Sequence, residues 1–192
     1  MPTNLRTLFR PLLDEIGLPE HEYWEIERVG RVAGIFPVGK TGPGGGTPAT
    51  TRAVTMAVIA LMAGLTKRDG ARLAPHYAAA PYRNFDAEDT NAISMKWSGR
   101  DSHLTNVMCA VTKKATFGDA LEAALSSWME IAISDVQINH DLQLATINFD
   151  GGKSQFGRGV AGDEPLRYTI TTIQAPFWAH LAARMAELGI KD

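Results

Sequence analysis

Residues 34–41, GIFPVGKT, match the phosphate-binding pattern G-x-x-x-x-G-K-[ST] at every fixed position. In that motif backbone amides surround phosphates, the lysine (here Lys40) reaches the outer phosphates and the hydroxyl (here Thr41) holds magnesium. The motif needs a helix that begins at its lysine, because the helix N-terminus forms part of the anion site. Here residues 42–48 read GPGGGTP, which prevents that helix. We therefore expect no nucleotide hydrolysis and no enzyme.

The same residues have the composition of a flexible contact with phosphates. They lie in a basic stretch, residues 28–72, that holds seven Lys or Arg against a single Asp, a net charge of +6 in a chain of net charge −2. Glycines let a backbone approach phosphates closely, and basic side chains neutralise them without reading base sequence. The alternative for this loop is an ordinary solvated surface turn. The expected contacts with double-stranded DNA are Arg28, Arg31, Lys40, Thr41, Arg52, Lys67, Arg68 and Arg72.

Four carboxylates precede this basic stretch, at Glu20, Glu22, Glu25 and Glu27, and Arg28 is the first positive residue after them. Carboxylates in the major groove would be repelled by the phosphates on both sides. The segment is therefore a poor reader of bases. It also opens a second hypothesis, a protein-binding inhibitor or adaptor that uses this acidic helix as its contact face and binds no nucleic acid.

Other reactive residue types are scattered. The five histidines show none of the spacings that place two metal ligands on one helical face. His140 and Asp141 are adjacent in the chain, and adjacent side chains rarely face each other, so we expect a turn there. Cys109 is the only cysteine, which excludes a disulfide within the chain and fits a reducing compartment. We expect no metal, no cofactor and no catalytic residues.

The composition indicates a folded protein. Of its 192 residues 45% are apolar, enough for the core of one domain or two small ones. The longest mostly apolar run, residues 54–65, is about half of the roughly 20 residues that cross a bilayer. The first 83 residues carry a net charge of +3 and the remainder −5, which favours polyanion binding by the first part. We expect a cytoplasmic protein without membrane contact.

Apolar periodicity predicts helices in the first part of the chain. The expected segments are 5–16, kinked or split at Pro11 and capped by Gly17, then 20–32, 50–62 and 69–80. The first two of these, joined through Gly17, make a helix-turn-helix candidate, with an ordinary helical hairpin as the alternative. Residues 1–83 are therefore expected to form a helical DNA-binding domain, followed by a linker at 84–102 that shows no sustained period.

In the second part of the chain the spacing of apolar residues changes from a helical period to the alternation that is typical of strands. A capping box at Thr116 predicts a helix at 117–133, alternating residues predict strands near 136–138, 142–149 and 167–173, and Pro176 starts a last helix that ends at Gly189. The expected fold class is α+β. A helix, a three-stranded antiparallel sheet and a second helix would form a domain at 103–192. We expect this domain to make a homodimer or to bind a protein partner.

Three segments of the first part occur in an order seen in a known family: EYWE at 22–25, GIFP at 34–37 and VTMAVIALMAGLT at 54–66. They resemble the N-terminal domain of MerR-type winged-helix regulators, over about 60 residues. The resemblance implies a winged helix-turn-helix with the glycine-rich loop as its wing, and a DNA-binding transcription regulator. Glu22 stands where that family has an arginine. The chain is also similar in general organisation to small regulators encoded by phages and prophages.

Overall fold

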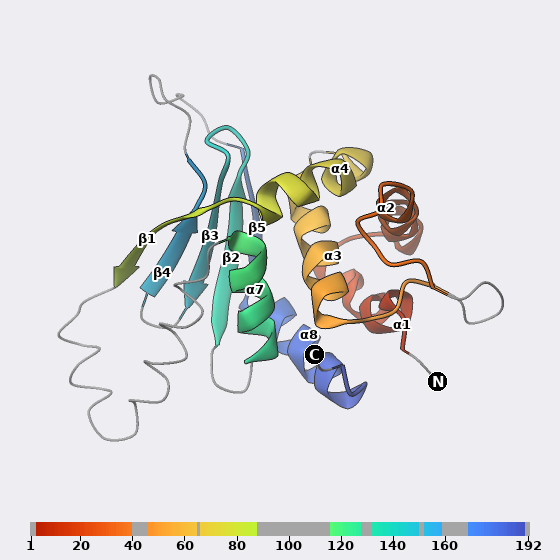
Figure 1. Ribbon diagram of the computed structural model, residues 1–192. Coiled ribbons are helices and arrows are strands. Elements are labelled where there is room, and N and C mark those ends of the chain that lie inside the picture. Colours follow the sequence, from red (N-terminus) through yellow and green to blue (C-terminus); the bar gives the residue numbers. More distant parts are fainter. Residues whose placement is uncertain are drawn as a thin grey trace.

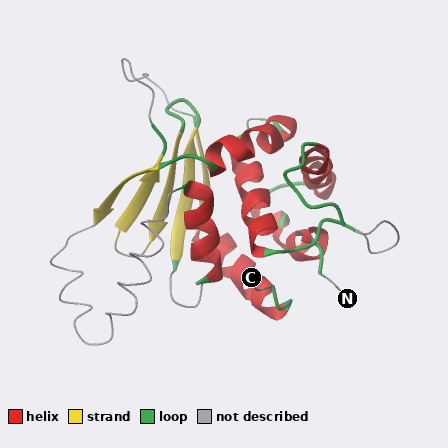
Figure 2. Cartoon of the chain, in the orientation of Figure 1, coloured by secondary structure: helices red, strands yellow, loops and turns green. Residues whose placement is uncertain are grey.

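The computed structural model describes residues 3–39, 46–64, 66–87, 116–127, 132–149, 152–158 and 169–190, with the backbone alone at 67, 68 and 84–87. These residues form an antiparallel sheet with helices packed beside it (Figures 1 and 2). The described part is a mixture of six α-helices and five strands, which confirms the expected α+β class. None of the described helices is long and apolar enough to cross a bilayer.

Four helices form the first part of the chain. Helix α1 stops early because Pro11 follows it, and two 3₁₀ turns, η1 and η2, continue to Gly17, whose φ of 63° is the left-handed cap that a glycine favours. The expected split at Pro11 is thus confirmed. The bounds are α1 Leu5–Phe9, η1 Arg10–Leu12, η2 Asp14–Ile16, α2 Glu20–Val32, α3 Thr51–Ala63 and α4 Lys67–Ala78.

Helix α3 lies at the centre of the molecule. The side-chain oxygen of Thr50 accepts a hydrogen bond from the Ala53 amide and caps its first turn. Eleven of its thirteen residues are buried, as expected for a helix that is apolar on nearly every side. It contacts α2 and α4 on one side and α7 (Phe117–Ser126) and the sheet on the other. The buried side chains of the helices and of the sheet therefore form a single core.

The described residues form a sheet of five strands, not the three that the sequence predicted. The order is β1-β4-β3-β2-β5, antiparallel throughout. The two missed strands pair with each other, and β4 also pairs with β3, so hydrogen bonds on both sides hold its glycine-containing segment extended. The bounds are β1 Tyr82–Ala87, β2 Ile133–Asn139, β3 Leu144–Phe149, β4 Gly152–Phe156 and β5 Ile170–Gln174.

Two boundaries in the second part differ from expectation. Helix α7 ends at Ser126 and the chain is already in β2 at Ile133, because that residue is buried in the sheet and paired with β3. The cap at Thr116 is confirmed, since its side chain accepts from the Asp119 amide. Strand β1 occupies the start of the segment expected as a linker, and residues 88–102 lie outside the described residues.

Helix α8 (Ala175–Glu187) follows β5 without a loop and returns along the core. The Trp178 indole nitrogen donates to the Ile173 carbonyl at 2.7 Å, which ties the helix to the strand before it. Phe177 and Trp178 are both buried. In Figure 1 this helix lies below α3 and beside α1, so the chain's last helix borders its first.

Helices α3 and α4 approach so closely at Gly70 that a Cβ there would lie 2.1 Å from the Ala60 carbonyl oxygen. We expect Gly70→Ala to destabilise the protein by about 1–3 kcal/mol, because overpacking against a backbone outweighs the gain of about 1 kcal/mol in helix propensity. Urea unfolding checks this. Arg72→Ala, on the exposed side of the same helix, is the control, and an unchanged or higher stability of the Gly70 variant would contradict the contact.

Candidate functional site

A buried carboxylate joins three segments of the helical part. The Glu27 side chain on α2 is 0% exposed. Its Oε2 accepts from Arg6 Nε of α1 at 2.7 Å, and its Oε1 accepts from the amide and the hydroxyl of Thr47 at 3.0 and 2.9 Å. Burial alone would raise the pKa of this carboxyl, but the hydrogen bonds from Arg6 and Thr47 outweigh it and hold the pKa below its ordinary 4.5. Glu27 is thus ionised and fully bonded.

The two ends of the glycine-rich loop meet beside this carboxylate. A Cβ on Gly39 would lie 1.6 Å from the Gly46 carbonyl oxygen, so the loop leaves and returns at one point. The Leu5 amide donates to the Thr47 carbonyl at 2.9 Å, which fixes the returning end to α1. The loop itself, residues 40–45, lies outside the described residues. Its base is therefore a fixed point on the surface of the helical part.

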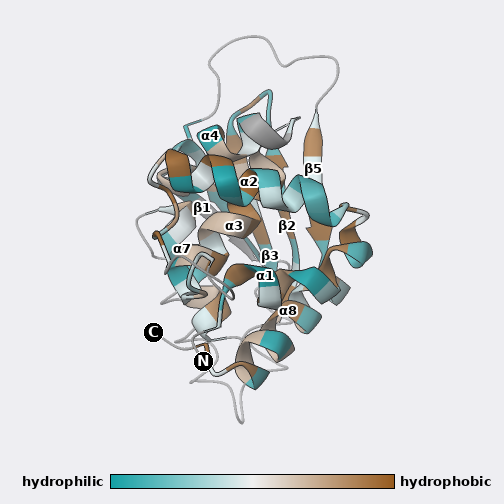
Figure 3. Cartoon of the chain, turned by 90° about the vertical axis from the view of Figure 1, so that its right-hand side faces the viewer, coloured by the Kyte–Doolittle hydropathy of each residue, from teal (hydrophilic) through white to brown (hydrophobic). Residues whose placement is uncertain are grey.

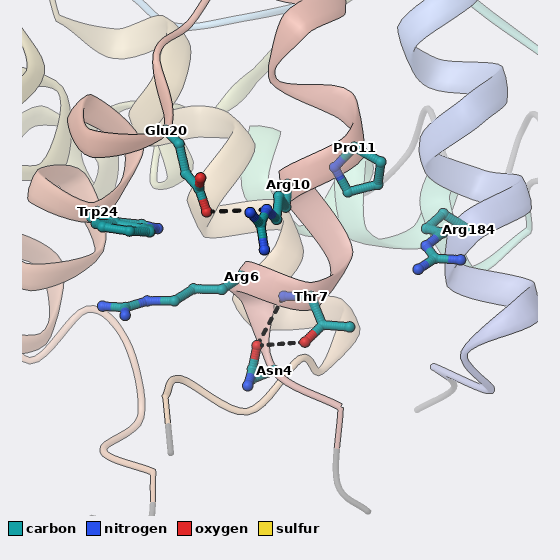
Figure 4. Close-up of a pocket in the computed structure, with 8 residues that line it drawn as sticks. All are labelled: Asn4, Arg6, Thr7, Arg10, Pro11, Glu20, Trp24 and Arg184. Atoms are coloured by element: carbon teal, nitrogen blue, oxygen red, sulfur yellow. Dashed lines mark hydrogen bonds and ion pairs between the residues drawn. The ribbon is translucent and has the colours of Figure 1, made fainter. Parts of the chain in front are cut away.

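An open groove of about 730 Å³ begins next to that base. Three arginines, one glutamate and one tryptophan supply its charged and aromatic lining (Figure 4). Asn4 belongs to the groove and also lies against Gly46, which makes the groove and the loop base neighbours. The lining residues are Asn4, Arg6, Thr7, Arg10, Pro11, Glu20, Trp24 and Arg184, from the α1 and η1 region, α2 and α8.

The arginines of the groove differ in how firmly they are held. The Arg6 guanidinium carbon lies 5.2 Å from the centre of the Trp24 ring while its Nε bonds the buried Glu27. Arg10 pairs with Glu20 at 3.4 Å, and Arg184 pairs with Glu187 at 2.7 Å, both at the surface. Exposed ion pairs contribute about 0–1 kcal/mol. Arg10 and Arg184 can therefore exchange their partners for a ligand, whereas Arg6 serves the fold.

The structure places three of the sequence-predicted contacts in ion pairs within the chain. Arg28 donates twice to Glu25, at 2.8 and 2.6 Å. Arg52 pairs with two acidic residues of α7, the nearer being Glu122 at 2.8 Å, and so ties α3 to α7. Arg31 Nε lies 4.0 Å from Glu27 Oε1, beside the base of the loop. Each of the three guanidinium groups already faces a carboxylate.

The remaining predicted contacts lie in two places. Lys40 and Thr41 belong to the loop outside the described residues. Lys67 and Arg68 begin α4, the helix labelled near the top of Figure 3, and Arg72 is exposed one turn later in the chain. This helix begins near the C-terminal end of α3 and Arg52 lies at the start of α3, so roughly 20 Å, the length of a thirteen-residue helix, separates them. The basic residues of the stretch that the structure describes therefore lie toward both ends of α3 rather than in one cluster.

Sequence reasoning missed the residues of the groove. Arg6, Arg10 and Arg184 lie outside the basic stretch, and only the folding of α8 beside α1 brings the third of them near the first two. The signal for Glu27 was present, since Tyr23, Ile26 and Gly30 form one buried stripe of α2 and Glu27 lies on it. A carboxylate on an apolar stripe indicates a buried ion pair, which is what the structure contains.

A second, smaller pocket of about 400 Å³ lies between α4 and the turn after β2. His76, Tyr77 and His140 contribute to its lining. A hydrogen bond of 2.8 Å joins His140 Nε2 and Thr171 Oγ1, and the Tyr77 ring meets the His140 ring edge-on. Burial lowers the pKa of His140 below its ordinary 6.5, while the nearby Asp141 acts in the opposite direction. The neutral imidazole is therefore the form that this packing favours.

The chain matches none of the known protein families, curated proteins or solved structures with which it was compared. Among the residues that the structure describes, no three His, Cys, Asp or Glu side chains are grouped so as to hold a metal ion. What distinguishes the surface is thus the arginine-lined groove at the base of a basic glycine-rich loop.

Replacing Glu27 by Gln should lower the free energy of unfolding at pH 7 by about 3 kcal/mol, because Arg6 and Thr47 lose a charged, buried acceptor. The stability that Glu27 contributes is present above its unfolded pKa near 4.5 and is lost as the pH falls through its lower folded pKa. Wild type should therefore lose stability more steeply than the variant in acid.

Urea unfolding of Glu27→Gln between pH 7 and pH 3 measures both effects. Glu25→Gln, which removes the surface partner of Arg28, is the matched control and should cost less than about 1 kcal/mol. Equal stabilities of the two variants would mean that the buried carboxylate does not hold the three segments together.

His140 should make stability depend on pH in a different range. Its folded pKa is lowered, so the unfolded chain binds the proton more readily, and stability should fall as the pH drops below about 6.5. His140→Gln should flatten this slope between pH 7 and 5 in thermal unfolding. The control is His21→Gln, an exposed histidine on α2. A slope in the His140 variant as steep as that of wild type would assign the effect to another group.

Proposed function

We propose that the protein binds double-stranded DNA through its phosphate backbone and acts as a transcription regulator of the type that phages and prophages encode. One observation carries the proposal: the glycine-rich loop starts and ends at a single point, where Gly39 meets Gly46, beside a groove lined with arginines. Lys40 and Thr41 follow this fixed point directly in the chain. A loop anchored at its base presents basic and hydroxyl groups to phosphates without a requirement for base sequence.

In this proposal the basic residues contribute unequally to the binding of phosphates. Lys40, Thr41 and the α4 group of Lys67, Arg68 and Arg72 make the main phosphate contacts. Arg28 and Arg52 contribute by exchanging exposed ion pairs, which costs little. Arg31 is secondary because it lies beside Glu27 and helps to neutralise it.

The loop takes the part of the wing in a winged helix-turn-helix, and α2 supports it rather than reading bases. Two carboxylates of α2 pair with arginines, Glu20 with Arg10 and Glu25 with Arg28, and Glu27 is buried. The pairing reduces the repulsion that an acidic helix would exert on phosphates. It also supports a role in which α2 approaches DNA only at its basic end.

The second part of the chain supplies the partner contact, a homodimer or another protein. The described sheet has two edge strands, β1 and β5, and an edge strand offers unpaired backbone groups to a further strand. Many DNA-binding regulators bind two half-sites as dimers. Pairing through this part would place two loops on one duplex.

A protein-binding inhibitor or adaptor is the second candidate, favoured by one observation. Val32 at the end of α2 and Val38 just before the loop are 82% and 78% exposed. Two exposed apolar side chains in the segment that leads into a basic loop suit a protein surface better than a phosphate backbone. The engaged carboxylates of α2 reduce the acidic face on which this candidate first relied.

The DNA proposal is tested with a labelled duplex of 30 base pairs, by fluorescence anisotropy at several salt concentrations. We expect affinity that falls steeply with salt, and a double variant, Lys40→Gln with Arg72→Gln, that lowers the slope of log K against log salt by about 2, since each phosphate contact contributes about 0.9. Arg83→Gln, on β1 of the sheet, is the matched control and should keep the wild-type slope.

Absence of duplex binding by wild type at low salt would overturn the proposal. A double variant with the wild-type slope would overturn the assignment of the loop and α4 as the contact.

A further inference from the structure

Trp24 is an exposed aromatic side chain with a cation on one face. It is 41% exposed on the outer side of α2, and the Arg6 guanidinium lies over its ring at 5.2 Å. Arg6 is itself fixed by its hydrogen bond to the buried Glu27. The ring is therefore held in place from one side while much of its surface stays accessible. A held, exposed indole is a platform on which a planar ring can stack.

Two exchangeable arginines continue the groove away from this platform. In Figure 4, Arg10 lies between Trp24 and Arg184. The Arg10 side chain is 74% exposed and the Arg184 side chain 35%. Arg184 Nη1 donates to Glu187, and Arg184 Nε is buried without a hydrogen-bond partner among the described residues, so a phosphate would be bound by the terminal amino groups of this guanidinium rather than by Nε. A phosphate accepts from a guanidinium through two oxygens, which strengthens the pair over an ordinary surface contact.

The order of these groups matches a nucleic-acid strand better than a single small molecule. An aromatic surface is followed by one cation and then by a second, as a base is followed along a strand by successive phosphates. Each of the three arginines has a carboxylate partner, Glu27 for Arg6, Glu20 for Arg10 and Glu187 for Arg184, and the exposed pairs of Arg10 and Arg184 can be exchanged for phosphates. The volume of about 730 Å³ and the open form leave room for a strand that enters and leaves. A duplex, whose bases are stacked inside, cannot use the indole in this way.

We propose that the groove binds a short single-stranded segment of nucleic acid, with one base stacked on Trp24 and backbone phosphates on Arg10 and Arg184. Asn4 places the near end of this groove at the base of the glycine-rich loop. The site is distinct from the duplex contacts of the loop and α4 and does not depend on them. It would give the protein an affinity for melted or displaced strands.

The probe is fluorescein-labelled dT10, titrated with the full chain at 50 mM salt and followed by anisotropy. Removal of a base-stacking aromatic costs roughly 1–3 kcal/mol, so Trp24→Ala should weaken binding at least about fivefold, and Trp24→Phe should retain most of it. Tyr82→Ala is the matched control, because Tyr82 is a 38% exposed aromatic on the sheet. It should bind as wild type does.

A second pair of variants tests the phosphate contacts independently of the indole. Arg10→Ala combined with Arg184→Ala should lower the salt slope for dT10 by about 1.4, since each single-strand phosphate contact contributes about 0.7. Arg83→Ala is the matched control. Thermal unfolding of every variant confirms that the comparison is made between folded proteins.

The free nucleotide TMP, unlabelled, separates a strand site from a mononucleotide site. As a competitor it should displace dT10 far less well than unlabelled dT10 does. Displacement by TMP as effective as by dT10, absence of dT10 binding by wild type, or a Trp24→Ala affinity equal to that of Tyr82→Ala would each overturn the proposal. Because the duplex titration uses other variants, either proposal can fail while the other stands.

Discussion

The helical part depends on one buried ion pair, between Glu27 and Arg6. An ionised carboxylate with no exposed surface is strongly unfavourable unless its oxygens are bonded. Here Arg6 bonds one oxygen and Thr47 bonds the other twice. These donors come from the first helix and from the end of the glycine-rich loop, so the carboxylate can be satisfied only when both segments are in place. The electrostatic requirement of one side chain thereby fixes the position of the loop base.

The same ion pair prepares the groove. If Arg6 left Glu27, the buried carboxylate would lose its charged partner. The Arg6 guanidinium also lies against Trp24. The indole is thus positioned by a side chain that is itself held by the core. A binding surface whose side chains are already ordered loses less conformational entropy when a ligand arrives. Arg6 therefore has a structural role because its partner Glu27 is buried. Arg10 and Arg184, whose partners Glu20 and Glu187 lie at the surface, remain able to bind a ligand.

Local features of the sequence predicted the helices well and the sheet in part. Pro11 and Gly17 determined where the first helix breaks and ends, and Thr116 determined where α7 begins, because these effects act within a few residues. Strand β4 escaped prediction because GKSQF at 152–156 has little intrinsic preference for extended structure and is held by a strand on each side. Its neighbour β1 is an edge strand that pairs with β4 alone, so an analysis that missed β4 had no partner for β1.

The site was less predictable than the fold because its charges are paired over long stretches of chain. Arg52 appeared available in the sequence, yet its partner Glu122 is 70 residues away and meets it only when α7 packs on α3. The net charge counted within residues 28–72 is therefore larger than the positive charge that the surface has available to bind a polyanion. The deciding quantity is the cost of separating each pair. That cost is small for Arg10 and Arg184 at the surface and large for Arg6, so a phosphate competes with Glu20 and Glu187 but not with Glu27.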